Sequence, residues 1–165
     1  MKKVIVIGCP GSGKSTFSKK LNEITNIPLY HLDLMYWNND KTIVEKEVFL
    51  NKIVETLKKE SWIIDGNYRS TMELRIKEAD TVFFLDYDID FCLESVINRV
   101  GHKRSDLPWV EDKLDEEFIE YIKNYQTTNI PYIFEFFNKY QNKKIYIFKN
   151  RTEADNFLNS INKEG

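Results

Sequence analysis

The segment from Gly8 to Ser15, GCPGSGKS, constrains the fold of this 165-residue chain more than any other feature. It fits the pattern G-x-x-x-x-G-K-[S/T] at every fixed position, and it lies between the apolar run Val4–Ile7 and a stretch with helical periodicity. Glycines permit backbone angles that turn successive N–H groups toward one anion, and the N-terminus of a following helix adds a favourable dipole. The segment therefore predicts a strand, a phosphate-binding loop and a helix, in that order.

The phosphate-binding loop, Gly8–Ser15, predicts ATP as the bound nucleotide and Mg²⁺ as its metal. We expect Lys14 to reach the β- and γ-phosphates and the Ser15 hydroxyl to ligate Mg²⁺. Cys9 occupies a variable position of the pattern, and we interpret it as a small filling residue rather than a redox-active thiol. The expected nucleotide-binding residues are those of the loop, the residue after it and one distant arginine: Gly8, Cys9, Pro10, Gly11, Ser12, Gly13, Lys14, Ser15, Thr16 and Arg151.

The composition is typical of a globular protein, and we expect one domain over residues 1–165. A net charge of −2 provides no general attraction for nucleic acid or an anionic membrane, and no apolar run approaches the ~20 residues of a membrane span. The two cysteines, Cys9 and Cys92, are not spaced as a metal site, which favours a reduced, cytoplasmic protein. The oligomeric state stays open.

Strand-length apolar runs alternate with helical patterns along most of the chain. The runs cover residues 4–7, 27–32, 62–64, 81–85 and 144–148, and the main helical stretches cover 14–24, 43–59 and 89–100, with a last helix capped by Thr152. This alternation predicts an α/β fold, a parallel sheet with helices on both faces in three layers. Residues 101–141 contain helical patterns but no convincing strand, and we interpret them as a helical insertion between the fourth and fifth strands, either a lid or additional core.

The stretch WIIDGNYRS, residues 62–70, marks a second candidate site. Asp65 ends an apolar strand, Gly66 follows it and Arg69 comes four residues after Asp65. A simple turn would explain the pattern. However, the carboxyl ends of parallel strands face the ligand crevice of an α/β sheet, and Mg²⁺ prefers oxygen ligands. Asp65 is therefore our second candidate metal ligand, beside Ser15.

The segment after the second strand, YHLDLMYWNN, contains the candidate residues for a phosphoryl acceptor. A carboxylate there would orient an acceptor hydroxyl and accept its proton, whereas it would repel an acceptor phosphate, so Asp33 favours a hydroxyl acceptor. The alternative for Asp33 is a helix cap. His31 is more typical of a packed strand residue than of a catalytic one. Four aromatic residues suit either ring stacking or the core: Tyr30, Tyr36, Trp37 and Tyr68.

The stretch WIIDGNYR resembles the adenylate kinase segment in which a buried strand runs into Asp-Gly-Phe-Pro-Arg, within the nucleoside monophosphate kinase group of P-loop proteins. The resemblance implies that Asp65 holds Mg²⁺ and that Arg69 binds the acceptor phosphate or the γ-phosphate. Together with YHLDLMYW, ADTVFFLD and IYIFKNR, the stretch is also similar, over nearly the whole chain, to bacterial P-loop ATPases described as DNA topology modulation proteins, the FlaR-related group. Either resemblance implies the sheet order 2-3-1-4-5.

The remaining arginines gain roles from these resemblances. Arg99 and Arg104 stand where related kinases carry lid arginines that clamp the transferred phosphate, and the alternative is ordinary solvated charge. Arg151 stands in a loop that contacts adenine in those kinases. Arg75 could instead pair with Glu73 or Glu78. The chain departs from adenylate kinases because HLDLMYWNND contains no arginine and the insertion no cysteine, which weighs against AMP as the acceptor.

The function best supported by these observations is transfer of the γ-phosphoryl group of Mg-ATP to a small acceptor: a nucleoside, a nucleotide or a hydroxylated metabolite. The alternatives are a regulatory or nucleic-acid-linked ATPase and a nucleotide-binding switch. The candidate catalytic residues are Lys14, Asp33, Arg69, Arg99 and Arg104, and the candidate metal ligands are Ser15 and Asp65, with Asp86 ranked behind Asp65.

Overall fold

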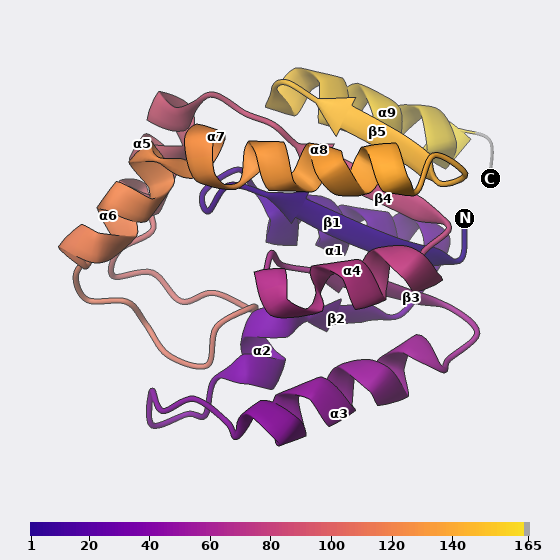
Figure 1. Ribbon diagram of the computed structural model, residues 1–165. Helices are drawn as coiled ribbons and strands as arrows, with labels where there is room; N and C mark the ends of the chain where they lie inside the picture. The colour runs from indigo at the N-terminus through magenta and orange to yellow at the C-terminus, as the bar shows by residue number, and fades with distance from the viewer. Residues whose placement is uncertain (164–165) are drawn as a thin grey trace.

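In the computed structural model, which describes residues 1–163, the five apolar runs form the strands of one parallel sheet (Figure 1). The strands follow the order β2-β3-β1-β4-β5, as the resemblances implied. Their bounds are β1 Lys3–Gly8, β2 Leu29–His31, β3 Trp62–Asp65, β4 Thr81–Leu85 and β5 Lys144–Phe148. The predicted α/β fold and its sheet order are thus confirmed.

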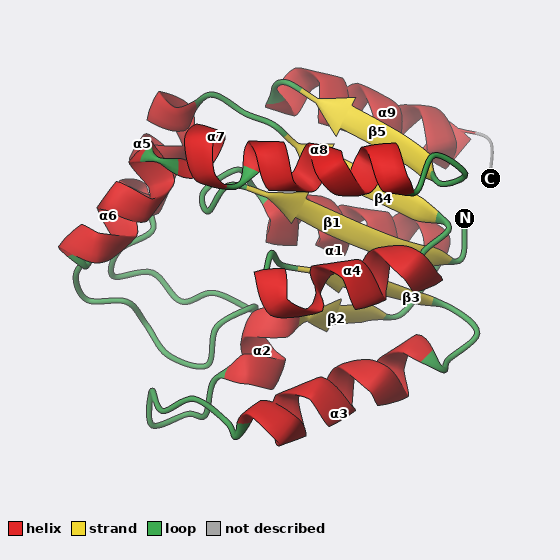
Figure 2. Ribbon diagram, viewed as in Figure 1, coloured by secondary structure: helices red, strands yellow, loops and turns green. Residues whose placement is uncertain are grey.

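Helices cover both faces of this sheet (Figure 2). Helices α1 and α9 lie together on one face, and α4 and α8 cover the other (Figure 1). The bounds are α1 Lys14–Thr25, α2 Leu32–Tyr36, α3 Lys46–Leu57, α4 Arg69–Glu78, α5 Ile89–Asn98, α6 Glu116–Lys123, α7 Tyr125–Thr128, α8 Ile130–Lys139 and α9 Arg151–Lys163.

Strand β4 shows how the two halves of the core form. Successive side chains of a strand point to opposite faces, so Phe83 and Phe84 enter different layers. The Phe83 ring lies 5.0 Å from that of Phe17 in α1, whereas the Phe84 ring lies 6.0 Å from that of Phe137 in α8. A strand buried on both faces needs a continuous apolar run, which is why Val4–Ile7 and Thr81–Leu85 do not alternate.

The predicted helical insertion between the fourth and fifth strands is present. An irregular segment, residues 99–115, follows α5 and leads into α6, which Asp115 caps by accepting a hydrogen bond from the Glu117 N–H at 3.0 Å. Helix α8 packs on the sheet through Ile133 and Phe137, so this part of the insertion is additional core. The irregular segment, α6 and the first turn of α8 also border the cavity described below.

Several local boundaries differ from the predictions. Asn150 rather than Thr152 caps α9, because its Oδ1 accepts from the Glu153 N–H at 3.0 Å. Helix α3 begins three residues later than expected, since an antiparallel bridge to Trp37 keeps Ile43 extended. Strand β2 is shorter than the run 27–32. Asp88 caps α5, because its Oδ1 accepts from the Asp90 N–H at 2.9 Å. Over residues 1–163, no helix has both the length and the apolar character needed to cross a membrane.

Candidate active site

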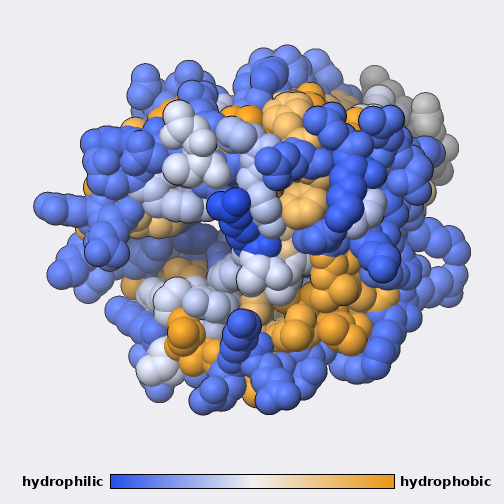
Figure 3. All heavy atoms as spheres, viewed as in Figure 1, coloured by the Kyte–Doolittle hydropathy of each residue, from blue (hydrophilic) through white to orange (hydrophobic). Residues whose placement is uncertain are grey.

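A cavity of about 910 Å³ lies at the carboxyl ends of the strands, between the phosphate-binding loop, α4 and the insertion. Figure 3 shows this face of the molecule hollowed between mostly hydrophilic side chains. The structure brings the charged and metal-binding candidates together on its wall: Lys14, Ser15, Thr16, Asp33, Asp65, Arg69, Arg99, Arg104 and Arg151. Within the loop, Pro10, Gly11 and Gly13 also line the cavity, and Gly8, Cys9 and Ser12 are buried beneath it.

The phosphate-binding loop has the backbone that its glycines predicted. Gly11 and Gly13 have φ angles of 85° and 87°, which side chains rarely adopt. A Cβ on Gly11 would stand 2.2 Å from the Cys92 carbonyl oxygen, so only glycine lets the loop pack on α5. Lys14 lies along the loop, donating to the carbonyls of Gly8 at 2.9 Å and Cys9 at 3.2 Å. Burial lowers the pKa of Lys14.

The chain after β3 is attached to this loop through Asn67. The Asn67 side-chain amide donates to the Gly8 carbonyl at 2.8 Å and accepts from the Gly8 N–H at 3.2 Å. Gly66 has a φ of 125°, and a Cβ there would meet Leu32 at 2.9 Å. The Asp-Gly-Asn sequence thus makes a tight turn that joins β3 to the start of the phosphate-binding loop.

Asp65 lies on the cavity wall, but its carboxylate is engaged by a histidine. His31 and Asp65 are register partners on β2 and β3, and the His31 Nδ1 lies 2.8 and 3.0 Å from the two carboxylate oxygens. Burial lowers the pKa of His31, but the hydrogen bond and the charge of Asp65 outweigh burial, so this pKa is raised. The partner of His31, which the sequence left open, is therefore the predicted metal ligand.

Asp33 faces the cavity from the first turn of α2. His31 occupies the N-cap position of that helix, and no side chain caps it by a hydrogen bond, so the cap alternative for Asp33 is wrong. Its Oδ1 instead accepts from the Tyr68 hydroxyl at 2.5 Å. Burial raises the pKa of Asp33, and the bond from Tyr68 partly opposes that rise. The net rise in pKa makes the Asp33 carboxylate more basic than an exposed one.

Tyr68 connects this site to the core. It has a φ of 36°, unusual for a non-glycine residue, and its ring packs against Tyr36 at 4.8 Å and Phe49 at 5.2 Å between centroids. Of the four aromatic candidates, Tyr68 alone is among the residues that line the cavity, over the described part of the chain. Trp37 packs edge-on against Trp109, and Tyr30 accepts a hydrogen bond from Lys59.

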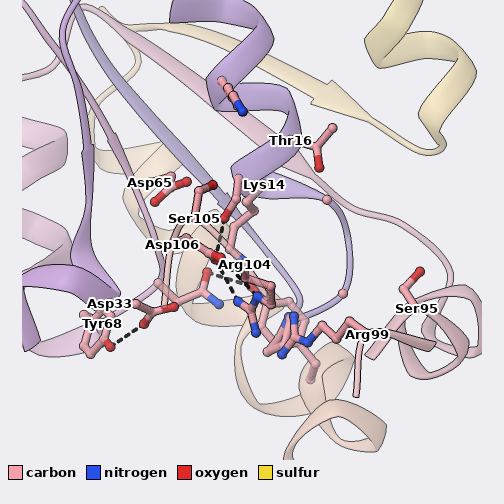
Figure 4. A pocket seen from close by; sticks show the side chains of 18 of the residues that line it. Lys14, Thr16, Asp33, Asp65, Tyr68, Ser95, Arg99, Arg104, Ser105 and Asp106 are labelled. Atoms are coloured by element: carbon pink, nitrogen blue, oxygen red, sulfur yellow. Dashed lines mark hydrogen bonds and ion pairs between the residues drawn. The ribbon is translucent and has the colours of Figure 1, made fainter. Parts of the chain in front are cut away.

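A residue that sequence reasoning missed, Asp106, forms the centre of an ionic network beside the loop (Figure 4). Its Oδ2 accepts from the Ser15 hydroxyl at 2.7 Å, and Arg104 donates to both carboxylate oxygens, at 3.0 and 2.7 Å. Burial opposes ionisation, but Arg104 and Ser15 lower the pKa of Asp106 to about 2. Arg104 and Arg99 also pair with Glu111, at 2.8 and 3.2 Å. Both arginines therefore belong to a partly buried network, and the solvated-charge alternative is wrong.

The other arginines divide into structural and exposed groups. Arg75 does not pair with Glu73 or Glu78. It is buried and donates to the carbonyls of Gly66, Asn67 and Tyr68, which fixes the turn after β3. Burial lowers the pKa of Arg75 to about 9.

Arg69 is exposed at the cavity rim, with its guanidinium carbon 3.9 Å from the centre of the Tyr132 ring. Arg151, also exposed, approaches Gly13: one of its terminal nitrogens would stand 3.9 Å from a Cβ placed there. Asp86 pairs with Lys149 rather than with a residue of the cavity.

The donor set suits a magnesium ion that arrives with a nucleotide. Over residues 1–163, no group of three or more His, Cys, Asp and Glu side chains is arranged to hold a metal alone. Mg²⁺ commonly takes only one or two protein oxygens and completes its shell with water and phosphate oxygens. Ser15, Asp65 and Asp106 supply such oxygens on the cavity wall.

Fold, loop and cavity define the chain as an ATP-dependent P-loop kinase of a small molecule that uses Mg²⁺. No family model matches the sequence. A curated relative, the Shikimate kinase of Flavobacterium johnsoniae, is 29% identical over an alignment of 139 residues with gaps, and the match covers 74% of this chain and 78% of the relative.

Two solved structures share the fold at low sequence identity. The crystal structure of Shikimate kinase from Bacteroides thetaiotaomicron has a TM-score of 0.61 at 16% sequence identity, and the match covers 98% of this chain and 96% of that one. A putative kinase from Chloroflexus aurantiacus has a TM-score of 0.62 at 15% identity, with coverages of 97% and 96%. These likenesses support the P-loop kinase fold, and the resemblance to topology modulation ATPases stays a prediction.

Proposed function

We propose that this kinase transfers the γ-phosphoryl group of Mg-ATP to a hydroxyl group of a small acceptor, with Asp33 as the general base. The observation that carries the proposal is the position of Asp33: a largely buried carboxylate on the wall of the cavity that also holds Lys14 and Ser15. A raised carboxylate pKa favours proton acceptance from a hydroxyl near neutral pH. A phosphate acceptor needs no base and would be repelled by Asp33.

The phosphate side of the cavity supports this assignment. The N–H groups of the loop and the N-terminus of α1 suit the nucleotide phosphates, with Thr16 and Arg151 beside them. Lys14 exchanges its bonds to the Gly8 and Cys9 carbonyls for bonds to phosphate oxygens. When bound, Mg²⁺ neutralises charge on the phosphates, and Ser15 is its proposed ligand. Arg99 and Arg104 stabilise the charge that spreads over the transferred group.

The acceptor side favours a hydroxylated acid. Asp33 would receive the acceptor hydroxyl, and Arg69, held against Tyr132 at the rim, would bind an anionic group of the same molecule. The name of the curated relative, Shikimate kinase, favours the same class of acceptor.

The free, buried Cys9 and Cys92 favour a reducing, cytoplasmic location for the protein. We further propose that residues 1–165 form a single kinase domain.

The alternative is a regulatory ATPase of the topology modulation type. A net charge of −2 gives such a protein no general attraction for DNA, and Asp33 would have no task in it. A screen of ADP release distinguishes the two. Nucleosides, nucleoside monophosphates and small hydroxylated acids, shikimate among them, are supplied with Mg-ATP, and Lys14→Ala provides the blank. We expect release that depends on a hydroxylated acceptor. Hydrolysis at one rate with every acceptor would favour the ATPase.

A further inference from the structure

The hydrogen bond between Ser15 and Asp106 has a defined direction. A carboxylate can only accept, so the single hydrogen of the Ser15 hydroxyl points at the Asp106 Oδ2, 2.7 Å away. Both lone pairs of the Ser15 oxygen therefore face away from Asp106. Because a hydroxyl ligates Mg²⁺ through a lone pair, this bond orients Ser15 for its proposed role without competing for the metal-binding side of the oxygen.

Asp106 itself is held firmly. Asp106 is only 7% exposed, and the Arg104 guanidinium donates to both of its carboxylate oxygens. Arg104 in turn donates to Glu111 at 2.8 Å, within the same insertion. Figure 4 shows Asp106 and Arg104 together beside the loop. A continuous chain of charged hydrogen bonds thus links the loop to a segment that lies 91 residues further along the sequence.

The acid that the sequence assigned to the metal has a different partner. Both carboxylate oxygens of Asp65 lie within 3.0 Å of the His31 Nδ1, and the structure gives Asp65 no hydrogen bond to Ser15 within residues 1–163. The acid in contact with the Ser15 hydroxyl comes from the insertion instead.

We propose that Asp106 is a positioning residue of the magnesium site: it orients the Ser15 hydroxyl toward the metal of Mg-ATP and couples that metal to Arg104. The inference rests on the proposed function, since it requires Ser15 to ligate Mg²⁺. Asp106 acts through Ser15, so its removal weakens the contribution of the metal to nucleotide binding and leaves the metal-free contacts of the nucleotide intact.

The test measures ADP binding by titration calorimetry, once with Mg²⁺ and once with EDTA. Asp106→Asn keeps the shape of the side chain but removes the charge. We expect the gain in affinity that Mg²⁺ gives the wild type to fall about tenfold or more in this variant, with affinity in EDTA unchanged within about twofold. Asp106→Glu restores part of the gain. Asp112→Asn, which removes an exposed charge from the same insertion, keeps the wild-type gain.

A second pair of variants keeps the test decisive if Asp106→Asn also loosens the insertion. In a Ser15→Ala background, Asp106→Asn should cause no further loss of the Mg²⁺-dependent gain, because the residue through which it acts is gone. A further loss there, an unchanged gain in the single variant, or an equal loss with and without Mg²⁺ would each overturn the inference. A wild type whose ADP affinity ignores Mg²⁺ would instead overturn the proposed function itself.

Discussion

Asn67 and Gly8 share two hydrogen bonds, which tie the turn after β3 to the first residue of the phosphate-binding loop. The same Gly8 carbonyl also accepts from Lys14 at 2.9 Å. The side-chain amide of Asn67 therefore fixes the peptide group against which the principal phosphate-binding lysine rests.

Asn67→Ala removes both bonds and leaves a buried backbone N–H without its partner. We expect the free energy of unfolding to fall by about 1–3 kcal/mol and ATP affinity to fall with it. Urea unfolding followed by circular dichroism measures the first quantity. Asn51→Ala, on the exposed side of α3, is the control and should change the free energy by less than about 0.5 kcal/mol. Equal effects of the two substitutions would remove the role assigned to Asn67.

Gly11→Ala tests the close packing of the loop on α5. Gly11 and Gly101 both have positive φ angles, 85° and 79°, so alanine is strained at either position. Only at Gly11 would the new Cβ meet a backbone atom, 2.2 Å away, whereas at Gly101 it would have nothing within 4 Å. We expect Gly101→Ala to cost about 1 kcal/mol of stability and Gly11→Ala to cost at least about 2 kcal/mol more, with loss of ATP binding. Comparable thermal unfolding midpoints would contradict the predicted clash.

Tyr68→Phe tests the hydrogen bond to Asp33. That bond stabilises the carboxylate and so opposes the rise that burial causes in the Asp33 pKa. Its loss raises this pKa further, and because the base must be ionised, the acidic limb of the kcat/KM profile should move to higher pH. Tyr30→Phe provides the control, because the hydroxyl that it removes contacts Lys59 outside the cavity. A profile that stays in place in Tyr68→Phe would show that Asp33 is not the titrating base.

The His31–Asp65 pair predicts how stability depends on pH. The pKa of His31 is higher in the folded state than in the unfolded state. The stability that His31 contributes is therefore fully present at a pH below its unfolded-state pKa, and it is lost as the pH rises through its folded-state pKa. In EDTA, the free energy of unfolding should therefore decrease from pH 6 to pH 9. His31→Asn should flatten this decrease, and His102→Asn, at the exposed histidine, should not. The same slope in the two variants would exclude the pair as its source.

The phosphate-binding loop and Asp33 could be located from the sequence because each is marked by residues that are close together along the chain. Gly11 and Gly13 both adopt backbone angles that favour glycine, and the dense glycine pattern of residues 8–13 is visible in the sequence. Asp33 follows a recognisable strand, and a polar residue at that point faces the cavity in a parallel sheet. The strand order, by contrast, came from resemblance, because alternation of elements does not define which strands are neighbours.

The partners of these residues could not be predicted because tertiary structure sets them. His31 meets Asp65 only through the register of β2 and β3. Asp106 reaches Ser15 through an irregular segment with no periodicity to place it. Pairing of Arg75 along its helix was one alternative, but the turn after β3 presents three carbonyls in need of donors, and the buried guanidinium satisfies them.

The central claim is that Asp33 accepts the proton of an acceptor hydroxyl. Its most direct test is turnover of Asp33→Asn with Mg-ATP and the best acceptor of the screen, with the phosphate ester product identified by ³¹P NMR and ATP affinity measured in parallel. We predict a fall in kcat of about 10²–10⁴-fold, with ATP affinity nearly unchanged. Full turnover of Asp33→Asn to the same phosphate ester would contradict the claim.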